Sequence, residues 1–170
     1  EMLMLTRAEQ MNAADNDQRT EPYHTINRVI SHAGVVYPSE AIETDLEPLA
    51  SVKLAVAGEH LEQLLLIVLD NAVKYAGSNN PIQITGDVKE GRAYIAIADH
   101  GQGIPEKHLP YVMERFYRVD KSRSRPQGGN GLGLAIAKRL TERYKGEIRI
   151  ESKLNEGTTV TIILPVASDT

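Results

Sequence analysis

The sequence predicts one α/β sandwich domain, in which a mixed, mostly antiparallel sheet has helices on one face. Two observations support this fold class. Alternating apolar and polar residues predict two β-hairpins, one from residues 82–88 and 92–98 and one from residues 147–152 and 158–164. A strong helical pattern of apolar residues over about residues 59–76 provides a face that can cover such a sheet.

Composition limits the classes of function. The chain has 170 residues, 41% hydrophobic and 25% charged, which is typical of a globular domain. Its net charge of −4 argues against a domain that binds nucleic acid over its whole surface. The absence of cysteine excludes disulfides, thiolate nucleophiles and cysteine-ligated metals. The longest aliphatic run, residues 64–69, is far shorter than the ~20 residues that span a bilayer.

The N-terminal residues look like the end of something longer. The chain opens with Glu1 and no signal-peptide pattern, so we expect a piece of a larger protein. Residues 1–15 have an apolar stripe and are expected to be the tail of a longer helix, and residues 16–21 a linker. The main domain is then expected over residues 22–165, with a short tail at 166–170.

Within that domain the elements follow in order. Pro22 is expected to open a helix, because proline is favoured in a first helical turn. Residues 41–46 and 52–56 alternate and predict two short strands around a turn at Pro48. After the helix of about residues 59–76, the two hairpins flank a long irregular loop over residues 99–133 and a helix of about residues 132–144.

The helix of residues 59–76 has a polar stripe beside its apolar face. Asn71, Lys74 and Tyr75 share this stripe, with Ile67 one turn before Asn71. An amide oxygen can ligate a hard cation, and Lys74 and Tyr75 can reach phosphate oxygens. The stripe therefore fits an anion with its metal ion, although a solvent-facing polar surface explains the same residues.

The sequence has two glycine-rich segments, one directly after a predicted strand and one directly before a predicted helix. Asp99 ends an alternating strand and is followed by Gly101, Gly103 and Ile104, so the carboxylate can accept a hydrogen bond from an exocyclic amine. An ordinary strand-to-loop turn is the alternative. The second segment, residues 128–133, enters a helix whose free N–H groups suit polyphosphate. Its position near the C-terminus and its lack of a following Lys-Ser/Thr pair exclude Rossmann and P-loop contexts.

Between the glycine segments lies a basic stretch that is expected to form a lid. Five cationic residues occur between Arg115 and Arg125, in an otherwise acidic protein. Such a segment suits a loop whose cations close over phosphates, with Phe116 anchoring its base; a solvated basic loop is the alternative.

Taken together and in this order, these segments and Glu156-Gly157-Thr158 resemble the catalytic ATP-binding domain of sensor histidine kinases. That domain belongs to a wider superfamily with gyrase-type, heat-shock chaperone and mismatch-repair ATPases. The resemblance covers about residues 22–165. It implies a Bergerat-type sandwich that holds ATP and Mg²⁺ between the helix of Asn71 and a flexible ATP lid.

The resemblance also implies roles for individual residues. Asn71 would coordinate Mg²⁺, with Lys74 and Arg118 acting beside it in catalysis, and Asp99 would bind the adenine amino group. The remaining ATP-binding positions are Tyr75, Gly101, Gly103, Ile104, Tyr117, Gly129, Gly131, Leu132, Gly133 and Thr158. The implied partners are a dimerisation domain that carries the phosphoacceptor histidine and a response regulator. The implied parent is a membrane-anchored bacterial sensor with this portion in the cytoplasm.

Two departures from the family pattern affect the mechanism. Ile67 stands where many relatives have a second asparagine and hydrolytic cousins have a glutamate. Isoleucine cannot take a proton, so ATP hydrolysis through that residue is excluded and phosphoryl transfer is favoured. No acceptor motif is present either, because none of the five histidines is followed by an acidic residue: His24, His32, His60, His100 and His108. We therefore expect no autophosphorylation by this chain alone.

Two rival functions stay open at this level. An anti-sigma-type serine kinase would use a related sandwich, and acid-stable phosphoprotein would distinguish it from a histidine kinase. A non-catalytic nucleotide-sensing module would have the same fold and bind the nucleotide without transferring a phosphoryl group.

Overall fold

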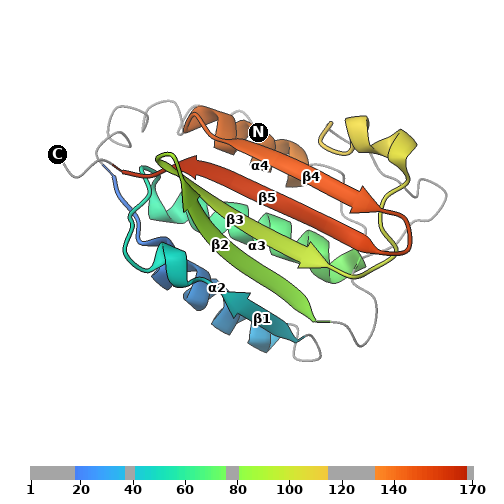
Figure 1. The fold of residues 1–170 in the computed structure, drawn as a ribbon, viewed down its shortest axis with the longest axis horizontal. Coiled ribbons are helices and arrows are strands. Elements are labelled where there is room, and N and C mark those ends of the chain that lie inside the picture. The colour runs from blue at the N-terminus through green and yellow to red at the C-terminus, as the bar shows by residue number, and fades with distance from the viewer. Residues whose placement is uncertain (1–17, 37–40, 76–80, 115–132, 168–170) are drawn as a thin grey trace.

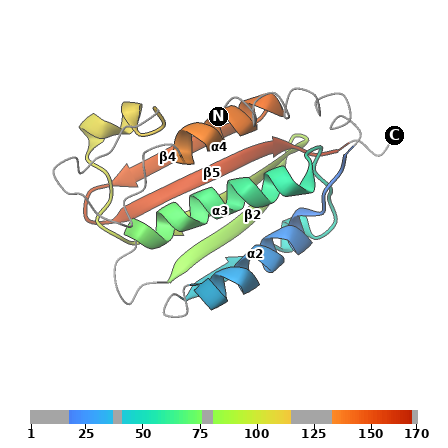
Figure 2. The same ribbon diagram turned by 180° about the vertical axis from the view of Figure 1, so that it is seen from behind.

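The computed structural model describes residues 18–36, 41–75, 81–114 and 133–167. In the described residues, five strands form one sheet, in the order β1 (Ile42–Asp45), β2 (Ile82–Lys89), β3 (Arg92–Asp99), β5 (Gly157–Pro165) and β4 (Glu147–Lys153). Only the β1–β2 pair is parallel, and the three other neighbouring pairs are antiparallel. Figures 1 and 2 show the α-helices of the described residues on one face of this sheet. The predicted mixed, mostly antiparallel sandwich is therefore confirmed.

The first half of the chain builds the lower edge of the sheet and its first helix. α2 (Pro22–Val36) begins at Pro22, as predicted. β1 (Ile42–Asp45) is followed by a single 3₁₀ turn, η1 (Glu47–Leu49). Leu49 is completely buried and lies so close to Gly86 that a Cβ there would be 2.4 Å from its Cδ1. The sheet therefore needs glycine at position 86 to accept this turn.

The prediction of a strand over residues 52–56 is wrong. Only Leu54 pairs, through isolated bridges to Thr20 and to Val166. Leu54 and Val56 are nevertheless fully buried. The alternation in this segment thus reflects burial of every second side chain without a strand beside it to pair with.

The two predicted hairpins form. β2 (Ile82–Lys89) and β3 (Arg92–Asp99) pair up to Lys89↔Arg92, which leaves a two-residue turn. Both turn residues, Glu90 and Gly91, have positive φ, as a type I′ turn requires. β4 (Glu147–Lys153) and β5 (Gly157–Pro165) form the second hairpin.

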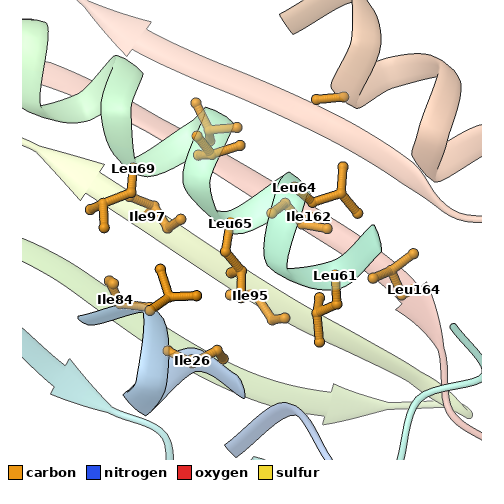
Figure 3. Packing of buried hydrophobic residues seen from close by; sticks show 14 of the residues in the cluster. Ile26, Leu61, Leu64, Leu65, Leu69, Ile84, Ile95, Ile97, Ile162 and Leu164 are labelled. Carbon is orange, nitrogen blue, oxygen red and sulfur yellow. The ribbon is translucent and has the colours of Figure 1, made fainter. Parts of the chain in front are cut away.

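The core lies between the sheet and its helices. α3 (Gly58–Tyr75) lies across the middle of the sheet, and its buried leucines point toward isoleucines of β3 and β5 (Figure 3). α4 (Gly133–Arg143) packs beside α3 and ends before Tyr144, whose hydroxyl hydrogen-bonds the Nδ1 atom of His60 near the start of α3. Leu69 and Ile97 pack together near one end of this core. Leu69 lies two residues before Asn71, and Ile97 lies two residues before Asp99, both predicted site residues.

Parts of the predicted organisation lie outside the described residues. These are the N-terminal helix over residues 1–15, the C-terminal residues 168–170 and the whole of the predicted lid over residues 115–125. The described start of the long loop, up to residue 114, contains a 3₁₀ helix, η2 (Glu106–Tyr111). Among the described residues, no helix is both long and apolar enough to cross a membrane.

Candidate functional site

One end of the sandwich gathers the predicted site segments. Figures 1 and 2 show the carboxyl ends of α3 and β3, the β4–β5 turn and η2 together at that end. The packing of Leu69 on Ile97 explains this arrangement, because Asn71 and Asp99 each follow two residues later. The sheet and α3 thus bring the first two predicted segments to one end of the molecule.

A row of three polar residues closes the apolar face of the sheet at this end. Asp99 pairs with Thr158 and Thr158 with Ser152, so the three side chains stand side by side on β3, β5 and β4. Asp99 and Thr158 are each only 6% exposed. We call Asp99, Thr158 and Ser152 the polar row. Strand alternation puts them on the helix-covered face, directly beyond Ile97 and Val160.

Asp99 is a buried acceptor with only part of its capacity used. The backbone N–H of Gly101 donates to its Oδ1 at 2.9 Å. Burial raises the pKa of Asp99, against the opposing effects of backbone N–H donors of Gly101 and Thr158 and of nearby His100. A carboxylate kept in apolar surroundings binds a ligand N–H donor more strongly than one in water. Asp99 can therefore recognise an exocyclic amine.

The raised pKa of Asp99 predicts a pH-dependent stability. The folded state keeps the Asp99 proton at pH values where the unfolded chain, with a pKa near 3.8, has lost it. The free energy of unfolding should therefore fall as the pH rises from 3.8 to beyond the raised pKa of the folded state, and it should stay at the lower level at higher pH. Denaturant titrations of the wild type and Asp99→Asn across this range should show the decline only in the wild type. Parallel curves for the two proteins would contradict the assignment.

The loop after Asp99 runs against the β4–β5 turn. Gly103 has φ +75°, and a Cβ there would lie 2.2 Å from the carbonyl oxygen of Lys153. The Asn155 N–H donates to the Gln102 carbonyl at 2.7 Å, and the Ile104 N–H donates to Ser152 Oγ, also at 2.7 Å. These contacts hold the loop of residues 101–104 in one conformation beside the polar row.

Gly103→Ala is accordingly expected to destabilise the protein by at least about 2 kcal/mol, because alanine would adopt a left-handed backbone and meet Lys153. Chemical denaturation measures the change. Gly34→Ala is the matched control: the site is exposed on α2, and a Cβ there would meet no atom within 4 Å outside the adjoining residues and helix backbone, so the protein should be stabilised by up to about 1 kcal/mol. Equal effects of the two substitutions would show that the contact with Lys153 does not constrain the loop.

The carboxyl end of α3 holds the predicted phosphate-side residues. Asn71 and Lys74 are half-buried, and Lys74 Nζ lies 3.3 Å from a carboxylate oxygen of Asp70. Tyr75 is the last residue of α3. The amide and the ammonium group thus lie about one helical turn apart on α3, as the sequence predicted.

The amino end of α4 meets α3 within one turn of Asn71. A Cβ on Gly133, the first residue of α4, would lie 3.4 Å from Cγ2 of Ile67. The first N–H groups of a helix lack intrahelical partners and favour anions. The end of the second glycine segment therefore reaches the same part of α3 as Asn71.

The predicted residues fall into three groups. The first consists of Asp99, Gly101, Gly103, Ile104 and Thr158, which lie at and around the polar row. The second consists of Asn71, Lys74, Tyr75 and Gly133, which lie on α3 and at the start of α4. The third lies outside the described residues: Tyr117, Arg118, Gly129, Gly131 and Leu132.

Sequence reasoning missed two residues of the site. The sequence places Ser152 in a strand and indicates no role for it, yet its hydroxyl contacts Ile104 of the 101–104 loop, and Gly157 and Thr158 at the start of β5. Asp70 was not identified as a partner of Lys74. The i, i+4 spacing of Asp70 and Lys74 on a helix could have revealed their ion pair. The contacts of Ser152 depend on which residues of β4 and β5 lie opposite each other, which the sequence does not show.

Comparison with known proteins identifies the class. Residues 57–168 match the HATPase_c family, described as histidine kinase-, DNA gyrase B- and HSP90-like ATPase. The chain belongs to this family, as the catalytic ATP-binding domain of a sensor histidine kinase.

Individual relatives agree with the class. The chain is 39% identical over 163 residues to the signal transduction histidine-protein kinase ArlS of Staphylococcus aureus, covering 96% of this chain and 36% of ArlS. It thus spans about a third of that relative's length. The mycobacterial sensor histidine kinase MprB structure is 27% identical with a TM-score of 0.76, covering 88% of this chain and 98% of that one. The catalytic domain of histidine kinase ThkA shares the fold, with a TM-score of 0.75 at 18% identity, covering 87% and 94%.

Proposed function

We propose that this domain binds ATP at the end of the sandwich where α3, β3 and the β4–β5 turn meet, with the adenine base at the polar row. The observation that supports this most is Asp99, a buried acceptor at a strand end beside a glycine turn. The adenine amino group is a donor of the right kind for it. Gly101, Gly103, Ile104 and Thr158 would line the base pocket.

The phosphates would extend from there toward α3 and the start of α4. Lys74, Tyr75, Tyr117 and Arg118 are proposed to contact them. The N–H groups of Gly129, Gly131, Leu132 and Gly133 would hold the phosphate chain. The closeness of Gly133 to Ile67, where an added Cβ would lie 3.4 Å from Cγ2, supports this direction, because Ile67 is one helical turn from Asn71.

Mg²⁺ fits the donors that are present. The described part of the chain has no group of three or more His, Asp or Glu side chains that could hold a metal ion. Mg²⁺ commonly takes one or two protein oxygens together with substrate phosphates and water. The half-buried amide of Asn71 is proposed as that protein ligand, and the bound ion would offset phosphate charge.

The proposed reaction is transfer of the γ-phosphoryl group to a histidine of a dimerisation domain. An imidazole nitrogen of the acceptor forms a bond to the γ-phosphorus, and the bond from that phosphorus to the β,γ-bridging oxygen breaks, which releases ADP. The domain supplies alignment and positive charge, through Lys74 and Arg118, and needs no strong base. Ile67 provides no group that could activate water in competition.

The partners follow from the proposed reaction. They are the phosphoacceptor domain of the same kinase and a response regulator that then takes the phosphoryl group. The proposed parent is a membrane-anchored bacterial sensor kinase with this domain on the cytoplasmic side. Its relationship to ArlS, a signal transduction histidine-protein kinase, supports this proposal.

A transfer assay in trans tests the proposal. The chain is mixed with a separately produced dimerisation domain of a related kinase, with ATP labelled at the γ position and Mg²⁺. We expect acid-labile label on that domain and none on this chain alone. Acid-stable label would indicate a serine kinase instead, and nucleotide binding without transfer would defeat the kinase function.

A further inference from the structure

The hydroxyl of Ser152 connects three parts of the proposed base pocket. The Ile104 N–H donates to Ser152 Oγ at 2.7 Å, and the hydroxyl donates to the Gly157 carbonyl at 3.0 Å. Its oxygen also lies 2.8 Å from Thr158 Oγ1. A serine hydroxyl has one proton, and a carbonyl can only accept, so the Thr158 hydroxyl is the donor in the third contact. Ser152 thereby fixes which way the Thr158 proton points.

The same hydroxyl acts on the neighbours of Asp99. It holds Ile104, the last residue of the 101–104 loop, and Gly157, whose Cβ position would lie 2.1 Å from the Asp99 carbonyl oxygen. Thr158, the next residue, pairs with Asp99, and its backbone N–H lowers the pKa of that carboxyl. Loss of one hydroxyl would therefore release the loop and the β5 start together.

We propose that Ser152 is a positioning residue for purine recognition, setting Thr158 and the 101–104 loop so that Asp99 selects an amino-purine over an oxo-purine. This inference rests on the proposed ATP site. An inosine nucleotide has a carbonyl oxygen where adenosine has its amine, and that oxygen would face a carboxylate with no proton between them. Such discrimination requires Asp99 to keep a fixed position relative to the base. Ser152 provides this by holding the 101–104 loop and the start of β5 on either side of Asp99.

The test compares binding of ATP and inosine triphosphate by calorimetry to the wild type, Ser152→Ala, Ser152→Thr and Ser51→Ala. Ser152→Ala should bind ATP about fivefold to tenfold more weakly, and its preference for ATP over inosine triphosphate should narrow. Ser152→Thr keeps the hydroxyl and should retain the preference. Ser51, exposed in the segment after η1, is the matched control and should change neither affinity.

Three outcomes would overturn the inference. Ser152→Ala could bind both nucleotides as the wild type does, or it could lose affinity for both by the same factor, which a purely structural role predicts. If Ser152→Ala does not fold, hydrogen exchange in the wild type decides: the Ile104 amide should be protected, and rapid exchange there would overturn it. A wild type that binds neither nucleotide would defeat the proposed function itself.

Discussion

Replacing Asp99 with asparagine is expected to lower the affinity for ATP by about a hundredfold or more, while leaving the fold at least as stable at neutral pH. The binding loss follows because the asparagine NH₂ group would face the adenine amine donor to donor, and a charge-assisted hydrogen bond would be lost. The folded protein should be at least as stable because burial raises the pKa of Asp99. The ionised carboxylate therefore lowers the free energy of unfolding at neutral pH, and the uncharged asparagine removes this effect. Calorimetry and denaturant unfolding measure the two effects.

Asp87→Asn is the matched control for this substitution. Asp87 is exposed on β2, and its Oδ1 also accepts a backbone N–H, from Val88 at 2.9 Å. It should leave ATP binding unchanged. An Asp99→Asn variant that bound ATP with wild-type affinity would remove the main support for the base pocket.

Replacing Asn71 with alanine is expected to lower the affinity for Mg-ATP by about tenfold to a hundredfold, and to reduce phosphoryl transfer further. The amide is the proposed protein ligand of Mg²⁺, and no cluster of three or more acidic or histidine side chains in the described ranges could replace it. The fold should persist, because Asn71 is only half-buried and alanine is the better helix former. Titrations with ATP, with and without excess EDTA, isolate the metal-dependent part.

The control for Asn71→Ala is Asn27→Ala. Asn27 lies exposed on α2, with its side-chain amide donating to the Tyr23 carbonyl at 2.9 Å. Neither nucleotide affinity nor transfer should change in this control. If Asn71→Ala lost the same affinity in EDTA as in Mg²⁺, the residue would contact nucleotide without holding the metal.

Local chemistry made much of the fold predictable. Pro22 has the fixed φ of a first helical turn, and α2 begins there. Alternation predicted the hairpin of residues 82–88 and 92–98, and Glu90 and Gly91 between its strands both have the positive φ of a type I′ turn. In each case neighbouring residues determine the backbone, so the sequence alone was sufficient.

Residues 52–56 show where such reasoning fails. The alternation of Val52, Leu54 and Val56 correctly indicated burial, but a strand also needs a partner along its length. Leu54 instead meets Thr20 on one side and Val166 on the other. The identity of those partners depends on segments far apart in the sequence, which periodicity does not encode.

The site was predictable to a similar extent. The grouping of Asp99 with the glycines after it at one strand end could be predicted, because a strand end, a carboxylate and small residues form a contiguous pattern. Ser152 was missed because its importance comes from its place opposite Thr158, across two strands, and from the loop that crosses it. A serine in an alternating strand gives no local sign of such contacts.

The order of strands leaves β1 and β4 as the two edges of the sheet, and both edges are charged. β1 exposes Glu43 and Asp45, while β4 exposes Arg149, Glu151 and Lys153. Charged side chains on edge strands oppose pairing with the edge of another molecule, which is the first step of aggregation. The proposed function requires repeated approach to a phosphoacceptor domain, and the charged edges keep such a domain from adhering, edge to edge, to its own copies.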